Sequence, residues 1–208
     1  MQPFRKHTGI VAPLDRVNVD TDQIIPKQFL KRIERTGFGE FLFYDWRFAG
    51  DGTTRTDFIL HEPRYKNATI LVAGKNFGCG SSREHAVWAL VDYGFRVVIA
   101  SSFADIFANN SLKNGLLTVR LADDQVAAIM NRARTIDDYK LTVDLESMSV
   151  GDGRGFSAVF TMDDFSRQCL LNGLDDIGLT LQHEAEIAVY EVKHPVQAAM
   201  TAIQTVSR

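Results

Sequence analysis

The chain has 208 residues, a length that fits one domain with extensions or two small domains. Hydrophobic residues make up 45% of it and charged residues 24%, a balance that is typical of globular proteins and excludes a disordered tail or a fibrous rod. Lys and Arg number 23 against 26 Asp and Glu, so the net charge of -3 leaves no basic excess for nucleic acid. The longest apolar run, residues 86–91, is far shorter than the roughly 20 residues of a membrane span. We therefore expect a cytoplasmic protein with neither a nucleic-acid nor a membrane partner.

The two cysteines bear on metal binding. Cys79 and Cys169 are ninety positions apart, and the five histidines are scattered without a His-x-x-x-His pair. A zinc or iron–sulfur site held by one chain needs about three or four ligands close together. We therefore expect that this chain holds no metal or cluster of its own.

The first third of the chain, residues 1–69, is irregular apart from a short strand expected at 9–11. After Pro26 it continues as a long stretch rich in aromatic residues and glycine. A connection of this length with little periodicity is usually functional or disordered, and its aromatic content argues against disorder.

The middle of the chain alternates between strand and helix patterns. Short β-branched runs predict strands that are buried on both faces, and periodic segments predict helices between them. In order, we expect a strand at 69–73, a glycine-rich loop at 74–80, a helix at 83–93, a strand at 96–100, a helix at 103–112, a strand at 116–121 and a helix at 125–134. Ser81 or Ser82 is expected to cap the first of these helices. This alternation predicts an α/β layer with parallel strands.

The last third is expected to contain strands at 141–145 and 155–160, followed by two helical segments. Apolar side chains recur at helical spacing in the second segment, and this pattern is usually a face that packs against the core. We expect such packing for Ile177, Leu181, Ala185, Ala188 and Val192.

The loop from Asn76 to Ala86 carries the residues with the most chemistry. Its glycines let the backbone approach a ligand closely, and the amide groups of a following helix favour an anion. Ser81, Ser82 and Arg83 add two hydroxyls and a guanidinium, which matches a carboxylate in bidentate fashion. The loop therefore predicts a site for a small carboxylate or phosphate. The alternative is purely structural, with Ser81 as a helix cap and Arg83 paired with Glu84 or with solvent.

Other anion-binding and nucleophile motifs do not fit the loop. The chain has no Gly-x-x-x-x-Gly-Lys-Ser/Thr, and the third glycine of a dinucleotide-binding loop is missing after Gly80. The string around Ser81 is not Gly-x-Ser-x-Gly, which makes a serine hydrolase a weak alternative.

The loop sequence Gly-Cys-Gly-Ser-Ser-Arg-Glu-His-Ala at 78–86 resembles the swivel-domain signature of the aconitase superfamily. Together with Asp-Thr-Asp-Gln-Ile-Ile-Pro at 20–26, the stretch Phe29 to Arg32 and the turn at 109–117, it is similar to the small subunits of bacterial 3-isopropylmalate dehydratases. The resemblance covers nearly the whole chain. It implies an α/β fold of the three-layer β/β/α swivelling type, with one domain over residues 1–208, a substrate loop at about 26–48 and a C-terminal helical extension.

The resemblance also implies a function. The family isomerises 2-isopropylmalate and 3-isopropylmalate by dehydration and rehydration in leucine biosynthesis, and this small subunit would be active only with its large subunit. The large subunit would carry the four-iron four-sulfur cluster, and the substrate would be a small dicarboxylate. Ser81 matches the base that removes the carbon-bound proton, whereas Ser82 and Arg83 match residues that bind the substrate carboxylate. Asp22 matches a supporting active-site aspartate.

Leu30 and Arg32 lie in the part of the substrate loop that would contact the variable group of the substrate. The arginine that grips an extra carboxylate in citrate-type substrates has no clear match, which fits a substrate with an isopropyl group. Small subunits that act on citraconate, homoaconitate or dimethylmalate remain alternatives, as does a non-catalytic carboxylate-binding module. Cys79 could approach the substrate or the cluster, or could be only a small packing residue.

Overall fold

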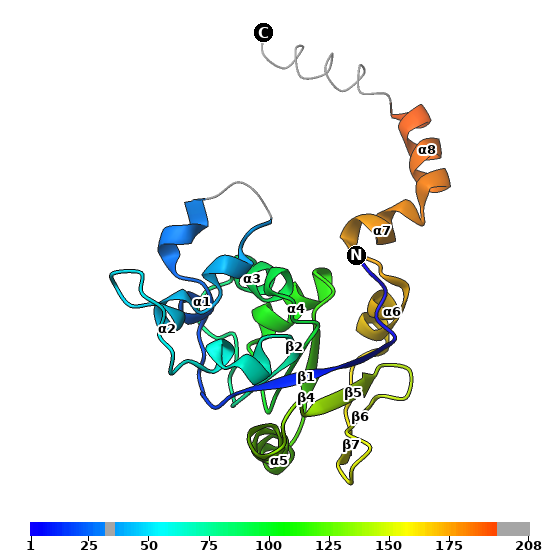
Figure 1. Ribbon diagram of the computed structural model, residues 1–208. Helices are drawn as coiled ribbons and strands as arrows, with labels where there is room; N and C mark the ends of the chain where they lie inside the picture. Colours follow the sequence, from blue (N-terminus) through cyan, green and yellow to red (C-terminus); the bar gives the residue numbers. More distant parts are fainter. Residues whose placement is uncertain (32–35, 195–208) are drawn as a thin grey trace.

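The structure is a computed structural model that describes residues 1–31 and 36–194. Seven strands form one mixed sheet in the order β4-β3-β2-β1-β5-β6-β7 (Figure 1). Their bounds are Lys6–Leu14 (β1), Ala68–Ala73 (β2), Val97–Ala100 (β3), Leu117–Arg120 (β4), Lys140–Asp144 (β5), Ser149–Gly151 (β6) and Ser157–Val159 (β7). Strands β1 to β4 are parallel neighbours, whereas β5 runs antiparallel to β1 and continues as a meander through β6 and β7. The expected α/β layer with parallel strands is confirmed.

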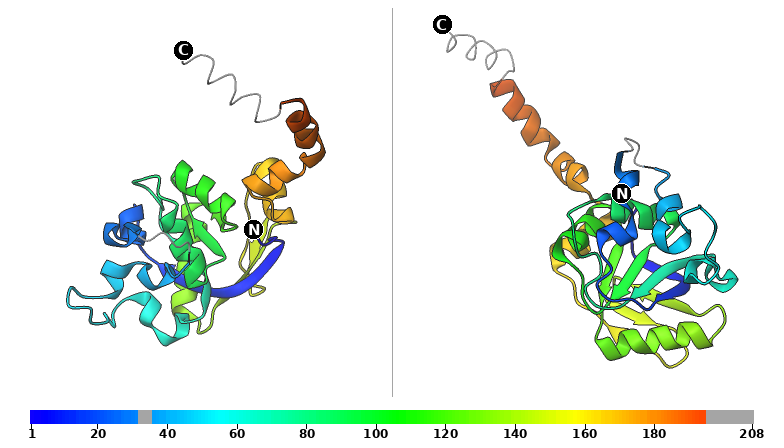
Figure 2. Two further views of the ribbon diagram at one scale, coloured as in Figure 1. Left: turned by 90° about the horizontal axis from the view of Figure 1, so that it is seen from above. Right: turned by 90° about the vertical axis from the view of Figure 1, so that its left-hand side faces the viewer.

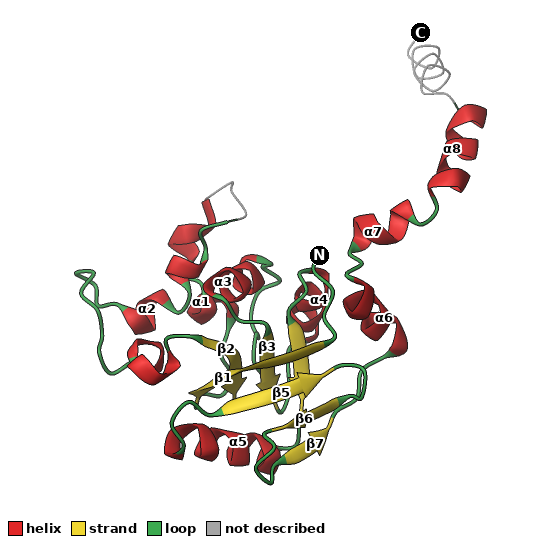
Figure 3. Cartoon of the chain, turned by 45° about the vertical axis from the view of Figure 1, so that its right-hand side comes forward, coloured by secondary structure: helices red, strands yellow, loops and turns green. Residues whose placement is uncertain are grey.

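The strands of the parallel half are apolar on both faces because helices cover both sides. In β2, Ile70 and Val72 belong to one core cluster, and the intervening Leu71 belongs to the other, as the two-residue period of a strand requires. Helices α3 (His85–Tyr93) and α4 (Asp105–Lys113) lie over one face, and α5 (Asp123–Thr135) lies over the other (Figure 3). The sheet curls, so that the inward side chains of β5, β6 and β7 share the core of α5.

The chain between β1 and β2 is a series of short helices. They are α1 (Thr21–Ile24), η1 (Lys27–Lys31), η2 (Gly39–Phe41), α2 (Tyr44–Arg47), η3 (Ile59–His61) and η4 (Pro63–Tyr65). Stacked aromatic rings hold them together, for example Phe29 on Phe41 and Phe43 on Trp46, with ring centroids 4.1 and 5.4 Å apart. The aromatic content of the stretch after Pro26 predicts that it is ordered. The part of this stretch that the structure describes is a packed segment, as predicted.

The C-terminal helices are α6 (Asp164–Asn172), α7 (Asp176–Leu181) and α8 (Glu184–Lys193). Helix α6 contributes Leu170 to the core, but α7 and α8 extend away from the sheet in every view (Figure 2). The expectation that the apolar stripe from Ile177 to Val192 packs against the core is wrong, because these two side chains are 71% and 82% exposed. The helical period arises from two separate short helices, neither of which buries a residue.

No helix within 1–31 and 36–194 combines the length and the hydropathy needed to cross a bilayer.

Candidate active site

The candidate site forms where the chain leaves two neighbouring parallel strands. Leu14 and Ala73, the last residues of β1 and β2, are register partners, so the following loops start at the same edge of the sheet. These loops then run side by side, with Gly78 N donating to Val19 O at 2.7 Å and Thr21 N donating to Cys79 O at 2.8 Å. The carboxyl edge of parallel strands is where α/β folds bind ligands. The two motifs at 20–26 and 78–86, about sixty residues apart in sequence, are therefore one structure.

Ser81 lies against Thr21, the first residue of α1. The two hydroxyl oxygens are 3.0 Å apart, and the backbone N–H of Ser81 donates to the Thr21 hydroxyl at 3.1 Å. Thr21 is 1% exposed. Ser81 is half-buried, so its side chain is both held by the protein and open to a ligand.

Arg83 donates a short hydrogen bond from its guanidinium to the Asp22 carboxylate. The other Asp22 oxygen lies 3.6 Å from the Lys27 ammonium. The Asp22 carboxylate therefore has two cationic neighbours, Arg83 and Lys27. Arg83 retains further N–H groups, because a guanidinium has five donors in a fixed plane. The open alternative that Arg83 pairs with Glu84 is wrong, since its carboxylate partner is Asp22.

Helix α4 holds the other side of the serine loop. Asn110 Nδ2 donates to Ser82 O at 3.3 Å, and Asn114 Nδ2 donates to the Glu84 carboxylate at 2.7 Å. Both asparagines belong to the turn at 109–117 that the resemblance includes, but their role as supports of the serine loop was not predicted. It depends on a contact between α4 and the residues before α3, which no local pattern reveals.

The prediction that Ser81 or Ser82 caps the following helix is wrong. Helix α3 starts at His85, with Glu84 in the capping position and no side-chain cap. The Ser81 hydroxyl is turned instead toward Thr21, and Gly80, with φ of +94°, provides the left-handed backbone just before it. The serines thus lie ahead of the first turn of the helix, so an anion bound beside them would meet side chains more than that turn's amides.

Gly78 determines how closely this loop packs against α4. Its φ is +76°, and a Cβ at this position would lie 2.2 Å from Cγ of Phe107 in α4. The loop backbone therefore packs directly on an aromatic ring, which only glycine allows.

Cys79 and His85 flank the serines without joining them. Burial, and after it the negative charge of Asp20, raises the pKa of the Cys79 thiol, so this group stays protonated near neutral pH. Burial lowers the pKa of His85, whose ring centroid is 4.6 Å from that of Trp88. His85 is thus a neutral ring in an aromatic contact.

The remaining predicted residues belong to the stretch at about 26–48 for which the resemblance implies a substrate loop. Leu30 lies in η1 and packs, half-buried, against the core cluster beneath α3. Arg32 lies outside the described residues. Of the six predicted site residues, the structure brings together Asp22, Ser81, Ser82 and Arg83.

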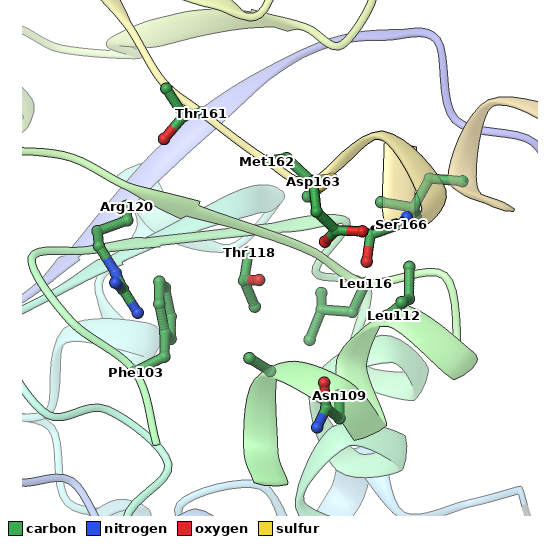
Figure 4. Close-up of a pocket in the computed structure, with 12 residues that line it drawn as sticks. Phe103, Asn109, Leu112, Leu116, Thr118, Arg120, Thr161, Met162, Asp163 and Ser166 are labelled. Atoms are coloured by element: carbon green, nitrogen blue, oxygen red, sulfur yellow. Dashed lines mark hydrogen bonds between the residues drawn. The ribbon is translucent and has the colours of Figure 1, made fainter. Parts of the chain in front are cut away.

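A separate cavity of about 260 Å³ lies between α4, β4 and α6 (Figure 4). Its lining includes Thr118, Arg120 and Asp163 together with Leu112 and Leu116, and none of the predicted site residues. Within the part of the chain that is described, no three His, Cys, Asp or Glu side chains are grouped as metal ligands.

Comparisons with known proteins agree on one family. The aconitase C-terminal domain family matches residues 1–124, and the family of C-terminal domains of 3-isopropylmalate dehydratase small subunits matches residues 176–198. The 3-isopropylmalate dehydratase small subunit of Brevibacillus brevis is 63% identical over 193 residues, covering 93% of this chain and 100% of that protein. The small subunit of Koribacter versatilis is 61% identical, with the same coverage. The crystal structure of 3-isopropylmalate dehydratase from Methanocaldococcus jannaschii superposes with a TM-score of 0.65 at 23% identity, over 89% of this chain and 99% of that one, which confirms the fold.

Proposed function

The chain belongs to the family of 3-isopropylmalate dehydratase small subunits, and from this membership we propose that it is half of a heteromeric hydro-lyase. The enzyme interconverts 2-isopropylmalate and 3-isopropylmalate by dehydration and rehydration in leucine biosynthesis. The observation that carries the proposal is the Ser81-Ser82-Arg83 loop against Asp22, within a chain about 60% identical to small subunits over more than nine-tenths of its length.

The second half of the enzyme is a large subunit that holds a four-iron four-sulfur cluster. When bound, that cluster supplies a Lewis acid for the leaving hydroxyl of the substrate. The proposed site of action is the cytoplasm, as for other biosynthetic enzymes of this kind.

Ser81 is the proposed base toward the carbon-bound proton. A serine hydroxyl is a weak base, so it must act as an alkoxide that nearby donors and positive charge stabilise. Arg83, two residues further along the chain, provides a fixed positive charge, and the half-buried position of Ser81 limits the water that would compete. Closure of this chain over the large subunit would exclude the remaining water.

Ser82 and Arg83 are proposed to bind a substrate carboxylate, with Asp22 as the group that orients the guanidinium. One edge of Arg83 is held by Asp22, so its free N–H groups are directed before the substrate arrives. A preorganised fork of this kind binds a carboxylate with less loss of side-chain entropy than a free arginine does.

The loop at about 26–48, which includes Leu30 and Arg32, is proposed to contact the variable end of the substrate. The half-buried Leu30 provides an apolar contact that is suited to an isopropyl group. Citraconate, homoaconitate and dimethylmalate are the other substrates that a test must compare.

The test uses the purified chain mixed with an anaerobically reconstituted large subunit, with dehydration of 2-isopropylmalate followed in the ultraviolet. Ser81→Ala is expected to lower turnover by at least ~1,000-fold, because general-base and nucleophile-type groups contribute on this scale. Ser157→Ala, an exposed serine of β7, is the matched control and is expected to keep full turnover.

Substantial turnover by Ser81→Ala in a fully assembled complex would contradict the proposed role of this serine. Turnover of a sister substrate with none of 2-isopropylmalate would change the substrate but keep the reaction class. Complex formation without turnover of any of these diacids would favour a non-catalytic binding module, and ester hydrolysis by the lone chain would favour a hydrolase.

A further inference from the structure

We propose that Thr21 is a positioning residue that keeps the Ser81 oxygen as the proton acceptor by donating a hydrogen bond to it. This inference rests on the proposed role of Ser81 as the base. In the part of the chain that the structure describes, the Ser81 hydroxyl has one hydrogen-bonding partner, which is the Thr21 hydroxyl at 3.0 Å.

The Thr21 side chain is fixed from several directions. Its backbone N–H donates to Cys79 O, so the residue is tied directly to the serine loop. Asp20 and Gln23 form a reciprocal capping box around it, with Asp20 Oδ1 accepting from Gln23 N at 2.7 Å and Asp20 N donating to the Gln23 side chain at 3.0 Å. Thr21 is 1% exposed, so its hydroxyl is buried in the contact between the two loops.

Either hydroxyl can be the donor in the contact between Thr21 and Ser81, and in the proposal Thr21 has the donor role. A threonine hydroxyl has one proton and two acceptor sites, and one acceptor site is filled by the backbone N–H of Ser81 at 3.1 Å. The proton then has two acceptors on Ser81, the side-chain oxygen at 3.0 Å and the backbone oxygen at 3.3 Å. The shorter distance favours the side-chain oxygen.

This arrangement has a chemical consequence for the base. When Thr21 donates to Ser81 Oγ, the proton of Ser81 itself points away from Thr21, toward the open side of the site. After that proton has passed to solvent water, the alkoxide still accepts a hydrogen bond from a buried donor, and such a bond lowers the free energy of the charged form. The Ser81 oxygen then takes the proton from the substrate carbon, whose bonding electrons form the double bond as the substrate hydroxyl departs. The Thr21 proton stays on Thr21 throughout.

The same contact places the oxygen. Ser81 follows Gly80, whose left-handed backbone gives the loop a sharp turn, and both ends of the Ser81 residue bond to one threonine. Thr21 therefore sets where the base lies, whereas Arg83 is set independently by Asp22.

Three variants of Thr21 in the assembled enzyme test the proposal. Thr21→Val keeps the shape and removes the hydroxyl, and we expect kcat to fall by about 100-fold, the range found for removal of one preorganised donor to an oxyanion. KM is expected to stay within about threefold, because Thr21 does not touch the substrate. Thr21→Ser restores the donor and is expected to recover kcat to within a few-fold. Thr21→Ala provides a second hydroxyl-free variant that adds no methyl group to the buried site.

The pH profile separates this role from a merely structural one. The limb of kcat against pH that reports deprotonation of the base is expected to move to higher pH in Thr21→Val and Thr21→Ala, and to return in Thr21→Ser. Thr180→Val removes an exposed threonine hydroxyl of α7 and is the control that leaves both kcat and the profile unchanged.

The outcomes distinguish this inference from the proposed function. If Ser81→Ala retains turnover, Ser81 is not the base, and the proposed role of Thr21 is overturned as well. If Ser81→Ala is inactive but Thr21→Val and Thr21→Ala keep the wild-type kcat and pH profile, the Thr21 inference alone is overturned. Adding Thr21→Val to Ser81→Ala is expected to cause no further loss, because the threonine acts through the serine.

Discussion

At the scale of single residues, the site depends on how the N–H donors of the Arg83 guanidinium are divided between Asp22 and a ligand. Arg83 bonds to Asp22 through one of its nitrogens and keeps its other donors for a ligand. A lysine at this position would carry the same charge but cannot hold an aspartate and a substrate carboxylate in one plane.

We therefore expect Arg83→Lys to lower kcat/KM of the assembled enzyme by at least ~30-fold, consistent with loss of a charge-assisted bidentate contact of about 2 kcal/mol or more. Steady-state kinetics with 2-isopropylmalate measures this. Arg5→Lys serves as the matched control, because its ion pair with Glu146 is exposed and Arg5 precedes β1, at the end of the strand opposite to the site. Unchanged constants in Arg83→Lys would show that Arg83 does not bind the carboxylate.

The residues that the sequence alone identifies are those within one motif. Ser81, Ser82 and Arg83 are adjacent and chemically distinctive, and Asp22 is found by resemblance to a second motif. Thr21 does not stand out in the sequence. Its importance for the site comes from its contact with Ser81, which lies sixty residues further along the chain. A threonine beside two aspartates looks like ordinary turn chemistry until both loops are placed at the same edge of the sheet.

At the scale of elements, the glycine loop is held by its packing on α4. Gly78→Ala introduces a Cβ where the Phe107 ring already lies and also strains a backbone with φ of +76°. We expect a loss of about 2–4 kcal/mol in the free energy of unfolding, since both overpacking and a left-handed non-glycine residue carry costs of this order.

Denaturant unfolding of the isolated chain measures this difference. Gly50→Ala is the control, because a Cβ at Gly50 has nothing within 4 Å and its expected effect is near zero. Equal stability of the two variants would mean that the serine loop is not packed on α4 as described.

The boundaries of α3 show where local patterns fail. The string Ser-Ser-Arg-Glu ahead of an apolar periodic segment is typical of a helix start, yet the helix begins only at His85. The Ser81 hydroxyl bonds to Thr21 and does not cap the helix, and Asn110 holds the backbone oxygen of Ser82 ahead of the first helical turn. Local sequence propensity correctly predicts most of the length of α3, whereas tertiary contacts determine where its first turn begins.

At the scale of the whole molecule, the parallel half of the sheet is predictable from the sequence, and in its continuation β5 and β7 are predicted but β6 is not. Buried β-branched runs predict the ends of β2, β3 and β4 to within one or two residues, because strands covered on both faces consist of near-continuous apolar residues. The three-residue strand β6 escapes prediction because Val150 is its one apolar residue, whereas β7, of the same length, lies within the more apolar segment 155–160. Periodicity also indicates an amphipathic C-terminal face, but it cannot tell what that face covers.

The exposed position of that face leads to a stability prediction. Val192→Ser in α8 is expected to change the free energy of unfolding by less than ~0.5 kcal/mol, the usual range for exposed positions. Leu170→Ala, which removes a fully buried side chain of α6, is expected to cost about 2–5 kcal/mol. Thermal or denaturant unfolding of both variants checks this. A comparable loss from both would show that α8 packs against the body of the isolated chain.

The proposed function depends above all on this chain supplying one half of a divided active site. The most direct measurement is the rate of 2-isopropylmalate dehydration as the chain is titrated into a fixed amount of anaerobically prepared large subunit. A divided site predicts no turnover by either protein alone and a rate that rises and saturates at a fixed ratio of the two chains. Turnover by the large subunit without this chain, or no turnover of 2-isopropylmalate at any ratio although the complex forms, would contradict it.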